Sequence, residues 1–182
     1  MTECGVSVVD TTASYFKTDG YWNGSVWMPH QWILWKALTD NGQGELADKI
    51  AMTALEIWKN EVNLSYNCCE LFMINNKRGA GFSQFSGLST PVLAWYNSYF
   101  VPGHISTGFL TIITEAEWDE DYSQVKFSCR TNSEYAYILI CMNEKYDYSF
   151  ENVEEYAKIN RAAYRLKIKP KDKKREITIT KR

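Results

Sequence analysis

The apolar residues of the chain change their spacing at Val101-Pro102-Gly103. Before this point they recur at three- and four-residue steps, which is typical of amphipathic helices. After it they alternate with polar residues, which is typical of half-buried strands. The pattern predicts an α+β protein with a helical domain over 1–103 and a β-rich domain over 104–182.

Three helices are expected in the first part. One begins at Met28-Pro29, where proline suits the first helical position, and runs to about Thr39. The clearest covers 44–62, and a third begins near Ser89 or Thr90, with Pro91 close to its start. The apolar stripe of the second helix consists of Leu46, Ile50, Ala54, Leu55, Trp58 and Val62.

The second part predicts short strands in an antiparallel, sandwich-like arrangement. The acidic run Glu115–Asp121 is interpreted as a solvated connection between two of them. The segments with period-two alternation are Phe109–Thr114, Val125–Cys129, Tyr135–Met142, Tyr164–Ile168 and Ile177–Ile179.

Composition and charge narrow the class of partner. The chain has 182 residues, 45% of them hydrophobic, so we expect a folded globular protein. A net charge of −2 gives no reason to expect nucleic acid or a membrane surface as partner. Residues 165–182 carry 9 basic against 2 acidic residues, and their alternation favours solvated strand faces over a polyanion site. No apolar stretch approaches the roughly 20 residues of a membrane span.

The cysteines and histidines give no metal or disulfide pattern. Five cysteines are an odd number without CxxC spacing, and the two histidines, His30 and His104, lie far apart. We therefore expect free thiols in a reducing compartment, and neither a metal nor a cofactor. The first ten residues lack the pattern of a secretory signal, which favours a cytoplasmic location.

Two aromatic blocks carry the candidate chemistry. Four tryptophans, at positions 22, 27, 32 and 35, fall within fourteen residues. Their flat apolar faces and polar edges suit a sugar ring, which has C–H faces and a hydroxyl rim. The second block, Tyr66–Phe72, contains Glu70 in a polar, turn-like context and is closed by the glycine-rich Arg78–Phe82. Together these blocks predict part of a carbohydrate-active site.

The first block, Asp19–Pro29, resembles a segment of the six-hairpin α/α-barrel glycoside hydrolases of family 63, which share a clan with trehalases. The second, Glu70-Leu71-Phe72 followed by a glycine-rich turn and Phe85-Ser86-Gly87, is similar to the block that follows it in that family. The resemblance covers roughly residues 5–100. It implies that the helices are part of such a barrel, or toroid, and that a β-sandwich-like domain follows.

The resemblance also implies site residues. By position, Glu70 matches the general base that activates water in the family's inverting reaction. Tyr66 and His30 would flank the sugar pocket, and Phe85 and Ser86 would form its far wall. The residues that would line the pocket itself are Tyr21, Trp22, Asn23, Gly24 and Trp27.

Two departures from the family pattern affect the predicted function. Asn23 stands where the family often has arginine, and toward the N-terminus, where the general acid is expected, Asp10 and Asp19 are the available acids. We therefore expect the C-terminal portion of a barrel, active in a longer or complemented chain. A non-catalytic carbohydrate-binding or remnant module remains the alternative. The expected partners are an oligosaccharide or glycoside, and either a second copy of the chain or a missing N-terminal barrel half.

Overall fold

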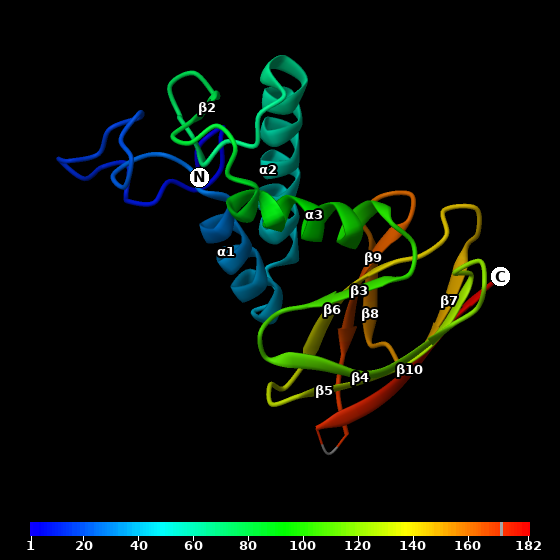
Figure 1. The fold of residues 1–182 in the computed structure, drawn as a ribbon. Helices are drawn as coiled ribbons and strands as arrows, with labels where there is room; N and C mark the ends of the chain where they lie inside the picture. Colours follow the sequence, from blue (N-terminus) through cyan, green and yellow to red (C-terminus); the bar gives the residue numbers. More distant parts are fainter. Residues whose placement is uncertain (172) are drawn as a thin grey trace. The chain divides into compact units, whose positions relative to one another are not determined.

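The computed structural model describes residues 1–171 and 173–182 (Figure 1). Within these residues the fold is α+β, with three helices and antiparallel sheets, as predicted. The helices are α1 (Met28–Asp40), α2 (Gly44–Ser65) and α3 (Ser86–Phe100). The chain divides into two compact units: a helical unit of residues 1–35 and 45–95, and a sheet unit of residues 36–44 and 96–182.

The strands of the described residues form one hairpin and two four-stranded sheets. The hairpin pairs β1 with β2, and the sheets have the orders β4-β5-β10-β7 and β3-β6-β9-β8. All of these pairings are antiparallel. The strands are β1 (Leu71–Phe72), β2 (Gly79–Ala80), β3 (His104–Thr107), β4 (Thr111–Trp118), β5 (Gln124–Thr131), β6 (Ala136–Cys141), β7 (Tyr148–Glu151), β8 (Glu155–Lys158), β9 (Ala163–Ile168) and β10 (Lys174–Lys181).

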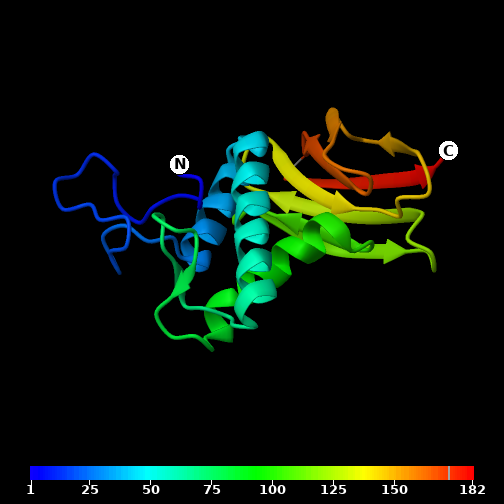
Figure 2. The same cartoon turned by 90° about the horizontal axis from the view of Figure 1, so that it is seen from above.

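The core of the sheet unit takes alternate residues from both four-stranded sheets. Figure 2 shows the ribbon of these sheets from a second direction. Phe127 and Ile177 come from one sheet, and Ile138 and Leu166 come from the other; all four are buried. The period-two pattern that predicted these strands is therefore the pattern of burial. The intervening positions hold Arg165 and Lys167 in β9, and Glu176, Thr178 and Thr180 in β10.

The acidic run Glu115–Asp121 is only partly the solvated connection that we expected. Its first half continues β4 to Trp118, where Glu115 and Glu117 lie opposite Ser128 and Lys126 of β5. Because β4 is an edge strand, its carboxylates can face water while its backbone still pairs with β5. The sequence pattern also missed β3, β7 and β8, which are four-residue strands at the sheet edges.

Helix α2 runs three residues beyond the predicted end, and its buried face differs from the predicted stripe. Leu46 is exposed, and Leu55, Trp58 and Val62 are only half-buried. The small residues on the neighbouring face allow closer packing there. The residues that α2 buries between its first and last turns are Ala47, Ile50, Ala51, Ala54, Ile57 and Glu61.

Helix α3 begins at Ser86, three residues before the predicted start, so Pro91 lies inside it. The Leu88 amide donates to the Phe85 carbonyl at 3.1 Å, and the Thr90 hydroxyl reaches the Ser86 carbonyl at 3.5 Å. These bonds form the first turn of α3 before the chain reaches Pro91. Because Pro91 has no backbone N–H, α3 lacks the hydrogen bond that this position would otherwise donate.

No described helix combines the length and apolar composition that crossing a bilayer requires.

We expect Leu166→Ala to lower the free energy of unfolding of the sheet unit by about 2–5 kcal/mol, because it opens a cavity in a fully buried cluster. Ile112→Ala, at an exposed position of β4, is the matched control and should change it by less than about 1 kcal/mol. Urea unfolding followed by circular dichroism measures both. Equal effects of the two variants would contradict the assignment of the core.

Candidate functional site

Two reciprocal backbone hydrogen bonds join the first aromatic block to the second. The Val26 amide donates to the Phe72 carbonyl at 2.8 Å, and the Phe72 amide donates to the Val26 carbonyl at 2.9 Å. The Ile74 amide also donates to the Thr18 carbonyl at 2.8 Å. Segments separated by more than forty residues in sequence are thereby held side by side.

The short hairpin β1–β2 sets the position of Glu70. Glu70 and Phe82 flank the hairpin, and the Glu70 amide donates to the Phe82 carbonyl at 3.0 Å. Between them, Gly81 adopts a φ of +72°, which L-residues with a side chain rarely adopt. A Cβ at Gly81 would lie 2.5 Å from Oε2 of Glu70. A glycine is therefore required both for the turn and for the space that the carboxylate occupies.

Glu70 is held as an ionised hydrogen-bond acceptor. The Tyr21 hydroxyl donates to its Oε1, and the Phe82 amide donates to its Oε2 at 2.9 Å. The hydrogen bond from Tyr21, and to a smaller extent that from Phe82, holds the pKa of Glu70 below its ordinary value. The same bond to Glu70 raises the pKa of Tyr21. Each carboxylate oxygen keeps a further lone pair for a water or a sugar hydroxyl.

An aromatic group lies next to this carboxylate. The ring of Trp22 stacks on that of Trp27 with centroids 4.1 Å apart and an angle of 7° between planes. Tyr21 meets both indoles edge-on, and His30 meets Trp22 edge-on at 5.7 Å. Trp27 is 3% exposed and donates from Nε1 to the Tyr21 carbonyl, whereas Trp22 is 56% exposed. Trp27 is thus the fixed support, and Trp22 offers a free face to solvent.

Asn23 and Gly24 shape the loop that carries these rings. The Asn23 side-chain amide donates to the Tyr15 carbonyl at 2.7 Å, and the Asn23 backbone carbonyl accepts from the Lys17 amide at 3.0 Å. Gly24 is buried, and a Cβ there would lie 1.5 Å from the Lys17 carbonyl oxygen. Both residues therefore close the loop, and the Asn23 amide group is engaged in that role.

The remaining predicted residues lie at different distances from this group. Phe85 contacts Phe82 edge-on at 6.3 Å, and its amide bonds to the Cys68 carbonyl, which brings it to the Glu70 side of the hairpin. Tyr66 follows α2 with a φ of 58° and is 84% exposed. Ser86 is the first residue of α3. Among the described residues, neither Tyr66 nor Ser86 hydrogen-bonds to Glu70.

An ion pair between the buried Glu61 and the half-exposed Arg78, which the sequence pattern did not reveal, supports the hairpin from α2. Glu61 is 3% exposed; it accepts from Nε of Arg78 at 2.7 Å, from Nη2 at 3.2 Å and from the Gly79 amide at 2.9 Å. These donors, Arg78 first, lower the pKa of Glu61 to about 2. The only sequence signal was a glutamate within the apolar spacing of a helix.

The five cysteines are free thiols, and the described residues contain no group of three or more His, Cys, Asp or Glu side chains that could hold a metal. The site is therefore built from one carboxylate, aromatic rings and backbone amides.

Acid should remove the contribution of the Glu61–Arg78 ion pair to the free energy of unfolding. Because the pKa of Glu61 lies near 2 in the fold and near 4.5 without its partners, the stabilisation is present above about pH 5 and is lost as pH falls toward 2. We expect Glu61→Gln to cost roughly 1–3 kcal/mol at pH 7 and progressively less below pH 5. Urea unfolding across this range measures it; a pH-independent difference would contradict the pairing.

Gly81→Ala should disturb the site, because alanine must adopt a positive φ and displace the Glu70 carboxylate. We expect a loss of about 1–2 kcal/mol in unfolding free energy and a shift of the Phe82 amide resonance. Gly87→Ala is the control. Its Cβ would meet only Phe85, at 3.9 Å, inside α3, where alanine should stabilise by about 0.5–1 kcal/mol. Effects of the same sign in both variants would contradict this geometry.

Comparison with known proteins gives matches that each cover about half of the chain or less. Residues 1–84 match the family model of the mannosylglycerate hydrolase MGH1-like glycoside hydrolase domain. The mannosylglycerate hydrolases MGH2 and MGH1 of Selaginella moellendorffii are each 32% identical over 91 residues, which are 50% of this chain and 18% of theirs. The chain thus spans less than a fifth of these relatives.

Among solved structures, the GH63 mannosylglycerate hydrolase from Thermus thermophilus in complex with glucose is 26% identical, with a TM-score of 0.42. That match covers 50% of this chain and 21% of the other. The family model and the Selaginella relatives confirm the resemblance to a glycoside hydrolase over part of the chain, and residues 1–84 are similar to the mannosylglycerate hydrolase MGH1-like glycoside hydrolase domain.

Proposed function

We propose that the chain contributes to hydrolysis of O-glycosidic bonds by inversion, with Glu70 as the general base. One observation supports this most: the Glu70 carboxylate is fixed by the Tyr21 hydroxyl and the Phe82 amide, and the Tyr21 ring also contacts the exposed Trp22. A fixed, ionised carboxylate next to an open aromatic face is what water attack on a bound sugar requires.

In this proposal the carboxylate accepts a proton from water as the water attacks the anomeric carbon. The low pKa of Glu70 keeps the group ionised at neutral pH, and its remaining lone pairs can receive the water. Tyr21 and Phe82 orient the carboxylate without protonating it. The sugar ring lies on Trp22, with His30 able to reach a hydroxyl at its edge.

The substrate we propose is a small glycoside, and mannosylglycerate is the first to test because the matched relatives are named mannosylglycerate hydrolases. The general acid belongs to a further segment or a second polypeptide. Asp10, one of the two candidate acids, already accepts from the Thr12 amide and hydroxyl, at 2.8 Å each. A low pKa also makes Asp10 a poor proton donor.

We further propose that the three helices are part of an α/α barrel, within a domain of residues 1–103, and that residues 104–182 form a β-sandwich-like domain. Two features support this assignment. The family match covers α1 and α2, and the buried cluster of the sheet unit draws on both four-stranded sheets. Self-association, or pairing with the rest of a barrel, would cover apolar side chains that the helices expose, such as Ile33, Leu64 and Leu93.

The test is hydrolysis of mannosylglycerate and of 2,4-dinitrophenyl α- and β-glycosides, whose leaving group departs without a general acid, by the chain and by Glu70→Gln, with Glu45→Gln as the control. Glu45 is exposed in the first turn of α2, far in sequence from both blocks. We expect Glu70→Gln to lower kcat by about 10²–10⁴-fold and Glu45→Gln to leave it unchanged. Full activity of Glu70→Gln would contradict the proposal. No turnover by either form, with saturable quenching of tryptophan fluorescence by the sugar, would favour the non-catalytic carbohydrate-binding module instead.

A further inference from the structure

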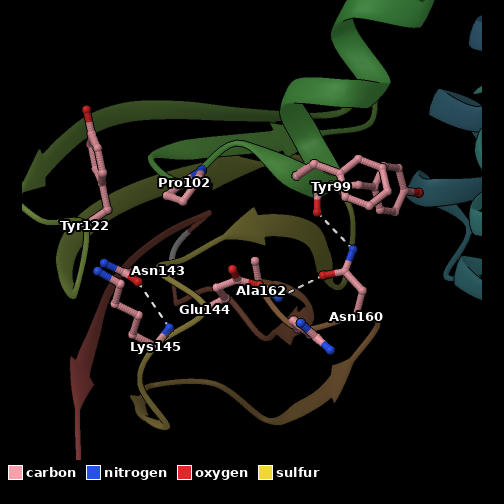
Figure 3. A pocket seen from close by; sticks show the side chains of 10 residues that line it. Tyr99, Pro102, Tyr122, Asn143, Glu144, Lys145, Asn160 and Ala162 are labelled. Atoms are coloured by element: carbon pink, nitrogen blue, oxygen red, sulfur yellow. Dashed lines mark hydrogen bonds between the residues drawn. The ribbon is translucent and has the colours of Figure 1, made fainter.

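The sheet unit contains a pocket that is separate in sequence from the Glu70 site. Its volume is about 390 Å³, within the range of about 300–1,000 Å³ that small-molecule sites occupy. Its walls come from the end of α3, the β4–β5 turn, the loop after β6 and the β8–β9 turn (Figure 3). Figure 3 draws Tyr122, Asn143 and Lys145 toward one end and Tyr99 and Asn160 toward the other.

Hydrogen bonds between the walls hold the pocket open. The Asn160 side-chain amide donates to the Tyr99 carbonyl at 2.9 Å, while its Oδ1 accepts from the Ala162 amide at 2.8 Å. On the other side, the Asn143 side chain donates to the Asp121 carbonyl, and its backbone amide donates to the Tyr122 carbonyl at 3.2 Å. Both asparagines are thus engaged in fixing the walls, so a ligand would meet a pre-formed site.

Tyr122 is held in an unusual conformation at this pocket. Its φ is 55°, in the left-handed region that a bulky residue rarely adopts. Its ring lies against Gly103, because a Cβ added at Gly103 would lie 2.6 Å from Cε1 of Tyr122. The ring also contacts that of Trp118, with centroids 5.8 Å apart. Tyr122 is nevertheless 43% exposed. Backbone strain that presents an aromatic face to a pocket points to a ligand-binding role.

The charged residues of the pocket favour an anion. The cations Lys145 and Arg161 are exposed, and neither forms an ion pair with a carboxylate of the described residues. Glu144 is the one acidic residue in the lining, so the described side chains leave a net positive charge there. The remaining lining includes the apolar Phe100 and Pro102, which suit the C–H faces of a ring.

We propose that this pocket binds a monosaccharide-sized ligand that carries an anionic group, either a carboxylate or a phosphate. Lys145 and Arg161 attract the anionic group, and Tyr122 and Phe100 contact the sugar ring. The proposal concerns the sheet unit alone and does not depend on the role of Glu70.

The test is a titration of the ¹⁵N-labelled full chain at constant ionic strength with D-glucuronate, D-glucose 6-phosphate and D-glucose. We expect saturable amide shifts at residues 122, 143–145 and 160–162 with at least one anion, and at least about tenfold weaker binding of glucose. The two anions show whether a carboxylate or a phosphate is preferred. Absence of shifts at these amides with both anions, or equal binding of glucose, would overturn the proposal.

Variants separate this site from non-specific attraction of an anion to exposed basic side chains. Arg161→Ala and Lys145→Ala should each weaken binding by about tenfold, while Arg130→Ala, exposed on β5, should leave it unchanged. Tyr122→Asn removes the ring but keeps a residue that tolerates positive φ, and should weaken binding several-fold. Unchanged affinity of both Arg161→Ala and Lys145→Ala would overturn the assignment of the anion site.

Discussion

The pair of backbone hydrogen bonds between Val26 and Phe72 is the constraint on which the candidate site depends. One partner ends the loop that carries Tyr21 and Trp22, and the other lies two residues after Glu70. With these bonds in place, a tyrosine hydroxyl can reach a carboxylate forty-nine positions away in sequence. Backbone bonds suit this role because they do not depend on side-chain rotamers and cost free energy when buried and broken.

Two glutamates near the same hairpin show how environment divides one residue type into two roles. Glu61 is buried and saturated by Arg78 and the Gly79 amide, so it has no access to a substrate and stabilises the fold. Glu70 receives only the Tyr21 hydroxyl and the Phe82 amide, and it keeps acceptor capacity toward solvent. Both have lowered pKa values, so a perturbed pKa alone would not have distinguished the candidate base from the structural carboxylate.

Much of the fold could be predicted from periodicity, because α1, α2 and the longer strands bury one face each. The short edge strand β8 was missed because all of its residues are exposed and no alternation marks it. At the site, the aromatic residues and Glu70 could be named from composition and motif, but the pairing of Tyr21 with Glu70 could not. That contact depends on the turn at Gly81, which has a positive φ, and on the Glu61–Arg78 ion pair that supports the hairpin. These features bring together residues that are distant in sequence.

The central claim, that Tyr21 and Phe82 hold Glu70 as an ionised base, is tested most directly by the pKa of the Glu70 carboxyl group. We would measure it by ¹³C NMR titration of the side chain in the unaltered chain and in Tyr21→Phe. The account predicts a pKa below the ordinary glutamate value in the first and a higher pKa in the second, because the hydroxyl donor stabilises only the ionised form. An ordinary or raised pKa, unchanged by Tyr21→Phe, would contradict it.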